Sequence, residues 1–454
     1  MLTKIKELLN KTGINEAIFY TSLARLIQGG GGLIVVILVT QRLTSIEQGY
    51  YFTFTSILAI QLFFELGLNN ILNQYVAHEI VQTQFSNEKL TGNKVAISRI
   101  NSLLHFSIKI YAILSLCLLI ILLLSGIFFF SYFSNNKGIE WKYPWILVSF
   151  TTTLYFLISP INAFLQGLGK VKEMAFMQFL QQSIAITSLI CSLLLGAKLY
   201  AGGIALFANI LVCILFIHIK FRKTLKYIYK TPITDRISYK KEIFPYQWKI
   251  AISWISSYFI FQLFNPVLFA TEGAIIAGKM GITLSVLNAI MSLSDSWITT
   301  KIPLFSGLIS KHNYTKLDSL FNLTLRQAFF VNLTILSIFL CILYIIDINN
   351  FSISGELLIK RFLPYTLIIM LMFTIILRQL YSGWAIYLRC HKKEPLLLQS
   401  VIMGGMCAIS TFILGHMYGV MGLVIGYTVL TIITTIWTYR VYTIKKKEWH
   451  HAIK

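Results

Sequence analysis

The sequence predicts an all-α integral membrane protein, with about twelve transmembrane helices in two pseudo-symmetric six-helix lobes around a central cleft. Of the 454 residues, 56% are hydrophobic and only 12% are charged, whereas a soluble domain carries about 25% charged residues. Long apolar segments recur from one end of the chain to the other. None of them alternates strictly between apolar and polar residues, as an outer-membrane barrel strand does. These observations exclude a soluble enzyme with a single anchor.

Twelve segments hold the roughly 20 largely apolar residues that a helix needs to cross the hydrocarbon. Several are longer, which predicts tilted helices or helices that extend beyond the bilayer. The predicted spans are residues 17–41, 49–76, 105–131, 144–166, 175–197, 200–219, 248–270, 275–304, 325–347, 362–388, 396–416 and 419–441.

The distribution of charge predicts the orientation of the chain. The net charge is +22, and most Lys and Arg residues lie in alternate connections, as cytoplasmic loops require. Both termini are therefore expected in the cytoplasm. The most basic connection, 220–247, is expected to contact anionic lipid headgroups rather than nucleic acid. It separates a predicted N-terminal lobe (1–219) from a C-terminal lobe with a basic tail (248–454).

Three pairs of landmarks recur at similar offsets, close to half the chain length, and favour an internal duplication. Two glycines open the second and eighth spans, two acids lie deeper in the same spans, and two glutamates follow the fourth and tenth. The pairs are Gly49 with Gly278, Glu65 with Asp295, and Glu173 with Glu394. Two similar lobes facing a cleft are the architecture that such a repeat predicts.

The first span carries Arg25, followed by the run Gly29-Gly30-Gly31-Gly32. An ionisable residue inside a span is costly and marks a functional position by default. The glycine run has two interpretations: close packing against a neighbouring helix, or a hinge at which the lobe bends. The sequence leaves both open.

Polar residues follow one face of the second, eighth and tenth spans. Gln61, Glu65, Asn69 and Asn73 recur every four residues, so this face lines either water or another helix. Asn288 and Asp295 lie on one face of the eighth span. The tenth span contributes Arg378, and Lys249 and Lys301 lie near the expected cytoplasmic side.

Two interpretations of these charges remain open. In the first, Arg25–Glu65 and Asp295–Arg378 are ion pairs that brace the lobes. In the second, the residues line a water-filled site for an anionic group, such as a phosphate loaded from the cytoplasm. Arginine suits the second role because its forked donors match phosphate oxygens.

The sequence contains no recognisable catalytic motif. It lacks the GxxxxGK[ST] phosphate-binding loop, a cluster of metal ligands and a paired-carboxylate or Ser/His/Asp arrangement. We therefore expect a protein that is not an enzyme and that has no cofactor or metal.

The chain resembles the Wzx-type polysaccharide flippases of the multidrug/oligosaccharidyl-lipid/polysaccharide exporter superfamily. The resemblance covers essentially the whole chain. The residues that carry it are the Arg25-containing first span, Leu43-Thr-Ser-Ile-Glu-Gln-Gly-Tyr-Tyr51, Phe64-Glu-Leu-Gly-Leu68, Gln166-Gly-Leu-Gly-Lys170 and the segment 273–281.

The resemblance implies a flippase that moves undecaprenyl-pyrophosphate-linked oligosaccharides from the inner to the outer leaflet of the bacterial cytoplasmic membrane. Such a protein serves O-antigen, capsule or related surface-polysaccharide assembly, with polysaccharide polymerases and glycosyltransferases as partners. Its two lobes alternate between inward- and outward-open states. A Na⁺ or H⁺ gradient is the expected energy source.

The resemblance also implies a cationic cavity, although the residues match it by type and depth rather than through a fixed motif. The expected substrate-binding residues are Arg25, Arg378, Lys249, Lys301, Gln61, Asn69 and Asn73, and the expected ion-coupling residues are Glu65 and Asp295. Two other functions stay open: a cation-coupled multidrug antiporter of the same superfamily, and a membrane polysaccharide polymerase or glycosyltransferase. Short outer loops disfavour the polymerase.

Overall fold

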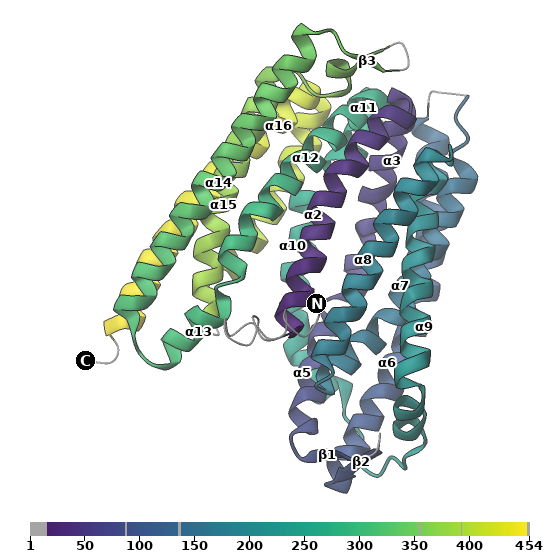
Figure 1. The fold of residues 1–454 in the computed structure, drawn as a ribbon, viewed down its shortest axis with the longest axis vertical. Coiled ribbons are helices and arrows are strands. Elements are labelled where there is room, and N and C mark those ends of the chain that lie inside the picture. The colour runs from purple at the N-terminus through teal and green to yellow at the C-terminus, as the bar shows by residue number, and fades with distance from the viewer. Residues whose placement is uncertain (1–15, 87–88, 135–137, 354–355, 392, 452–454) are drawn as a thin grey trace, which may run out of the picture. The chain divides into compact units, whose positions relative to one another are not determined.

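The structure, a computed structural model, describes residues 16–86, 89–134, 138–353, 356–391 and 393–451 (Figure 1). Almost all of these residues are helical, and the only strands among them form two short antiparallel hairpins. The predicted all-α membrane fold is confirmed. Contacts divide the described residues into two compact units, one within Met1–Gln28, Ile57–Tyr132 and Asn136–Ile255, the other within Gly29–Ser56, Phe133–Asn135 and Ser256–Lys454.

The first unit contains most of the N-terminal elements, and in it α7, α8 and α9 lie side by side (Figure 1). The elements, some of which continue into the second unit, are α2 (Glu16–Arg42), α3 (Ser45–Leu58), η1 (Ala59–Gln61), α4 (Leu62–Glu65), α5 (Leu68–Ile80), β1 (Thr83–Ser86), β2 (Lys89–Gly92), α6 (Lys94–Phe133), α7 (Lys142–Gly167), α8 (Val171–Leu194), α9 (Tyr200–Lys230), η2 (Tyr239–Ile243) and α10 (Phe244–Phe261).

The second unit contains the C-terminal elements, and in it α15 packs against both α14 and α16 (Figure 1). The elements are α11 (Phe264–Glu272), α12 (Ala274–Thr299), α13 (Ile302–Ser310), α14 (Tyr314–Ile348), β3 (Ser352–Ile353), β4 (Glu356–Leu357), η3 (Leu358–Arg361), α15 (Tyr365–Cys390) and α16 (Leu397–His451).

The number of spans agrees with the prediction once two irregular helices are considered. Ten described helices are long and apolar enough to cross a membrane, and a bent pair in residues 45–80 raises the number to 11. Helix α16 covers the last two predicted spans, because two helices join at Gly419, where φ is 59° and ψ is −143°. Counting α16 twice gives the expected twelve.

The outer surfaces of the helices are apolar, as a lipid environment requires. Helix α6 exposes Leu116, Leu124 and Phe128 although it is among the most apolar helices of the chain. Water would penalise such a surface at about 25 cal/mol per Å² of apolar area, whereas lipid tails do not. The chain is therefore a multi-pass membrane protein.

The second predicted span is broken in the middle. Helix α4 ends at Glu65, and α5 begins at Leu68 after Leu66 and Gly67, which have φ of 47° and 70°. A Cβ on Gly67 would lie 2.3 Å from Cγ2 of Ile250, so both the backbone conformation and the close packing require glycine there. The predicted polar stripe is thus divided among η1, which holds Gln61, α4, which holds Glu65, and α5, which holds Asn69 and Asn73.

Glycines explain why residues 29–56 cluster with the second unit. A Cβ on Gly49 would lie 1.9 Å from the Ala274 carbonyl oxygen, and one on Gly278 would lie 2.9 Å from the Gly49 nitrogen. Helices α3 and α12 therefore meet backbone to backbone at the two landmark glycines. In α2, a Cβ on Gly29 would lie 3.1 Å from Leu293, and the helix runs through the glycine run without interruption. This contact favours the packing interpretation for Gly29.

Within the first unit, one arginine of α6 forms ion pairs with the basic connection after α9. Arg99 on α6 forms ion pairs with Glu79 at 2.8 Å, Glu242 at 2.7 Å and Asp235 at 3.4 Å. The backbone N–H of Ser238 donates to Glu242 at 2.9 Å. This hydrogen bond, together with the Arg99 guanidinium, lowers the pKa of Glu242 below its usual 4.5.

Candidate functional site

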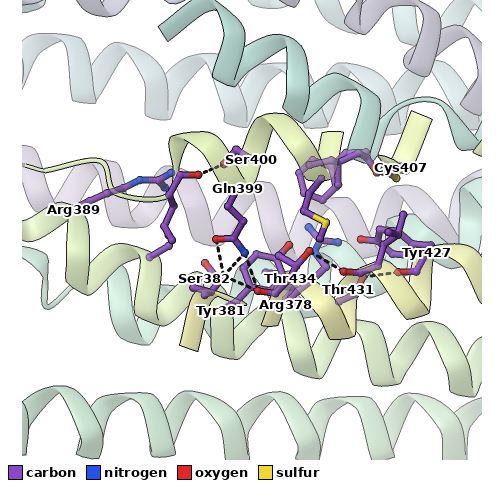
Figure 2. Close-up of a pocket in the computed structure, with 18 residues that line it drawn as sticks. Arg378, Tyr381, Ser382, Arg389, Gln399, Ser400, Cys407, Tyr427, Thr431 and Thr434 are labelled. Atoms are coloured by element: carbon purple, nitrogen blue, oxygen red, sulfur yellow. Dashed lines mark hydrogen bonds between the residues drawn. The ribbon is translucent and has the colours of Figure 1, made fainter. Parts of the chain in front are cut away.

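The second unit contains a cavity of about 300 Å³ that is lined by both polar and apolar side chains (Figure 2). Its wall combines two arginines, two tyrosines, several hydroxyl groups and one glutamine with apolar side chains. The lining residues are Ile260, Phe261, Met291, Arg378, Tyr381, Ser382, Ala385, Arg389, Leu396, Gln399, Ser400, Met403, Cys407, Tyr427, Leu430, Thr431, Thr434 and Thr438. None of these described lining residues is acidic, so the cavity suits an anionic ligand.

Helical periodicity places these side chains on facing stripes. Arg378, Ser382, Ala385 and Arg389 follow one face of α15 at spacings of four, three and four. The residues 427, 431, 434 and 438 repeat the same spacing on the second half of α16. Figure 2 shows Arg389 at one end of the row and Tyr427 at the other.

The threonines of α16 present acceptors to the cavity. Thr431, Thr434 and Thr438 each donate to the carbonyl oxygen four residues earlier, at 2.8 Å. A hydroxyl has one donor and two acceptor lone pairs, so acceptor capacity remains after each of these bonds. Gln399 fixes the row by donating through Nε2 to the Thr434 carbonyl at 2.9 Å and to Thr438 Oγ1 at 2.9 Å.

Arg378 is a less exposed lining residue than Arg389. Its Nη1 donates to Asn288 Oδ1 on α12 at 3.0 Å, and its guanidinium carbon lies 4.6 Å from the Phe261 ring centre. Tyr381 and Tyr427 also interact electrostatically with the guanidinium. Its Nε is buried and has no hydrogen-bond partner among the described residues. The arginine is thus held in place and keeps unused donor capacity.

Asp295 interacts electrostatically with Arg378, yet it does not form a contact ion pair with it among the described residues. Its Oδ1 is buried and lacks a hydrogen-bond partner in the part of the chain that the structure describes. Asp295 and Arg378 are therefore close enough to interact electrostatically, but the hydrogen bond of the Arg378 guanidinium goes to Asn288.

Arg389 lies at the other end of the cavity, about three helical turns along α15 from Arg378. It forms a forked ion pair with Glu394: Nε donates to Oε1 at 3.1 Å and to Oε2 at 3.2 Å, and Nη2 donates to Oε1 at 2.9 Å. The side chains are 54% and 46% exposed, so this end of the cavity opens to solvent.

The first unit gathers the other predicted acid and the polar stripe. Asn69 Nδ2 donates to Glu65 Oε1 at 3.0 Å and to Ser159 Oγ at 3.1 Å, while its Oδ1 accepts from Tyr111 OH at 2.8 Å. Asn73 Nδ2 donates to Gln166 Oε1 at 3.5 Å. For these two asparagines, the polar face meets other helices of the same unit.

The remaining predicted residues are distributed over both units. Arg25 is exposed on α2, and Lys301 is exposed between α12 and α13. Gln61 is the last residue of η1, and its buried Oε1 has no hydrogen-bond partner among the described residues. Lys249 belongs to α10, but its side chain lies outside the described part of the chain. Their expected contacts with substrate stay predictions.

Sequence reasoning identified Arg378 but missed most of the cavity. The threonine row was visible as a helical repeat in residues 427–438, but threonines in apolar helices commonly bond to their own backbone. Arg389 follows the predicted tenth span (362–388), so a place in the connection was expected for it. Gln399 was not recognisable as a site residue, because a single amide in a span is not distinctive.

No family model and no curated protein matches the chain. The chain does match solved structures. The chain is similar to a structure described as the inward-facing conformation of a multidrug resistance MATE family transporter of the MOP superfamily, with TM-score 0.60, 15% identity, and coverage of 91% of this chain and 99% of that one. It is also similar to the lipid II flippase MurJ in an inward closed conformation, with TM-score 0.64, 17% identity, and coverage of 94% and 87%.

An outward-facing structure of a MATE family transporter gives TM-score 0.55 at 16% identity, with coverage of 95% of this chain and 96% of that chain. The likeness extends over nearly the full length in each comparison. At these identities it establishes the fold, which the chain shares with transporters and with a lipid flippase.

Proposed function

We propose that this protein is a transporter that moves a lipid-linked oligosaccharide, carried on undecaprenyl pyrophosphate, from the inner to the outer leaflet of the bacterial cytoplasmic membrane. It would act in surface-polysaccharide assembly by alternating access, with both termini in the cytoplasm. The observation that carries this proposal is the cavity of the second unit, where two arginines and a row of hydroxyl groups lie without an acidic lining residue among those described.

The chemistry of the cavity fits the two polar parts of such a substrate. The unused Nε of Arg378 offers a charge-assisted hydrogen bond to a phosphate oxygen, which is roughly twice as strong as a neutral one. Thr431, Thr434 and Thr438 offer acceptors for sugar hydroxyls. Arg25, Lys249 and Lys301 would add positive charge along the route, and Gln61 would offer its amide oxygen to the sugars.

Asp295 is the proposed coupling residue. Its unpartnered carboxylate oxygen would bind H⁺ or Na⁺, and this would remove the negative charge that competes with a phosphate for Arg378. Glu65 is the second candidate, but its Oε1 already accepts from Asn69.

A cation-coupled multidrug antiporter is the second candidate function. The likeness to MATE structures and the two acids inside the predicted spans, Glu65 and Asp295, favour it. Arginines at a binding surface, however, repel a cationic drug, and the described lining of the cavity includes two of them. The charge of the cavity therefore favours the anionic substrate.

Reconstitution into liposomes tests the proposal. A fluorescent lipid diphosphate oligosaccharide is placed in both leaflets, and its accessibility to an impermeant quencher is followed over time. Protein-dependent loss of the protected pool, abolished in R378Q, is the expected result. Uptake of cationic dyes driven by proton flow in the opposite direction, with no movement of the lipid, would instead establish the antiporter.

A further inference from the structure

The open end of the cavity carries an ion pair that blocks one of its two arginines. Arg389 is a lining residue, and its guanidinium is occupied by Glu394 through three hydrogen bonds of 2.9–3.2 Å. A carboxylate and a phosphate present the same planar arrangement of two oxygens to the arginine fork. Glu394 therefore occupies the position that an anionic ligand of Arg389 would take.

The pair is weak enough to be exchanged. An exposed ion pair contributes little stabilising free energy because water screens the two charges. Both side chains of this pair are about half exposed. A diphosphate carries more charge than a carboxylate and offers more acceptor oxygens. It would therefore displace Glu394 without breaking a buried interaction.

The position of Arg389 suits an initial contact. Arg378 and Arg389 are eleven residues apart on one continuous helix, which corresponds to about 16 Å at 1.5 Å per residue. A single diphosphate group is shorter than this distance, so it cannot contact both arginines at once. The connection between the predicted tenth and eleventh spans is expected to face the cytoplasm, as both termini are. Arg389 would then lie at the loading end, and Arg378 farther along the cavity.

We propose that Arg389 is the first binding residue for the diphosphate group of a lipid-linked substrate. In the empty protein Glu394 occupies Arg389, and because the substrate must displace it, Glu394 lowers the apparent affinity for the substrate. This inference rests on the proposed function. In it, the headgroup exchanges with Glu394 at Arg389 and then moves along the threonine row to Arg378. Glu394 returns to Arg389 once the headgroup has passed.

Binding of inorganic pyrophosphate to the full chain in nanodiscs, measured by calorimetry at low ionic strength, tests the exchange through a double-mutant cycle. E394Q is expected to bind about two- to fivefold more tightly than the wild type, the range that an exposed pair supports. R389Q should bind more weakly, and E394Q should bring no further gain in the R389Q background. E448Q removes another exposed, ion-paired glutamate near the C-terminus and should leave the affinity unchanged.

The outcomes separate this inference from the proposed function. If R378Q abolishes binding while E394Q matches the wild type, or if E394Q tightens binding equally without Arg389, the exchange is refuted and the anionic site stands. If neither the wild type nor E394Q binds pyrophosphate, the anionic site fails, and the exchange fails with it.

The cycle is repeated with a short prenyl diphosphate dissolved in the nanodisc. The same pattern with this probe is expected for a lipid-linked substrate. A pattern confined to free pyrophosphate would overturn the assignment to a lipid-linked headgroup, because Arg389 would then select a soluble anion.

Discussion

Arg378 on α15 donates a 3.0 Å hydrogen bond to Asn288 on α12. The guanidinium also lies over the Phe261 ring. The buried Nε of Arg378 has no hydrogen-bond partner among the described residues. The arginine is therefore positioned by the unit and not neutralised by a contact carboxylate. This arrangement is the basis of the proposed anionic site.

Replacement of Arg378 should abolish transport without loss of the protein. R378Q is expected to lower the rate of lipid-linked oligosaccharide flipping at least about tenfold, because a charge-assisted contact with phosphate is lost. R378K should recover only part of the rate, since lysine lacks the fork. The liposome assay measures both rates. R440Q, at an exposed position of α16 away from the cavity, should behave as the wild type; equal rates in R378Q and R440Q would contradict the assignment.

Asn69 should act through stability and not through substrate contact. N69A leaves Tyr111 OH and Glu65 without their amide partner, which costs about 1–3 kcal/mol for each buried group. The melting temperature of the purified protein should fall, while the rate per folded molecule stays near that of the wild type. N70A, at the exposed neighbouring position, is the matched control. Normal melting combined with lost transport would instead identify Asn69 as a sugar contact.

The glycine contact between α3 and α12 should not tolerate a side chain. In G49A, the new methyl group would lie 1.9 Å from the Ala274 carbonyl oxygen, so the helices must separate at a cost of about 3 kcal/mol. Melting in detergent should show the loss. G30A provides the comparison, since no atom lies within 4 Å of its added Cβ and alanine is the better helix former. Equal melting temperatures for G49A and G30A would contradict the close contact.

The anchor of the basic connection should weaken in acid. The Ser238 N–H and Arg99 hold the pKa of Glu242 below 4.5, so the ionised form stabilises the fold above that pH and the contribution is lost as the pH falls through the lower, folded-state pKa. E242Q should melt below the wild type at pH 7, and the two should converge once the pH has fallen below the folded-state pKa of Glu242. The melting temperature as a function of pH gives this difference. A gap that stays constant throughout this acid range would show that ionisation of Glu242 is not the cause.

Much of the fold could be predicted from the sequence because membrane helices are long and apolar. Each predicted span lies in or overlaps a described helix. The helices extend further, as α9 does to Lys230, because polar residues beyond the bilayer continue a helix without any hydropathy signal. The break at Leu66 was not predictable, since leucine at positive φ is rare and carries no signal of its own.

The site was less accessible to sequence reasoning because a cavity is formed by residues from several helices. Arg378 could be identified alone, since a buried charge is costly wherever it lies. Thr434 and Gln399 become a site only when α15 and the two halves of α16 face each other, and that arrangement depends on the kink at Gly419. Arg389 and Glu394 gain a role only once the cavity places the arginine at its open end.

The most direct test of the proposed function is the sidedness of the lipid-linked oligosaccharide pool in cells that lack this chain. We expect the pool to accumulate in the inner leaflet, surface polysaccharide to be lost, and both to be restored by the wild-type chain but not by R378Q. An inner-leaflet pool that is unchanged in the deletion strain, with surface polysaccharide intact, would contradict the account.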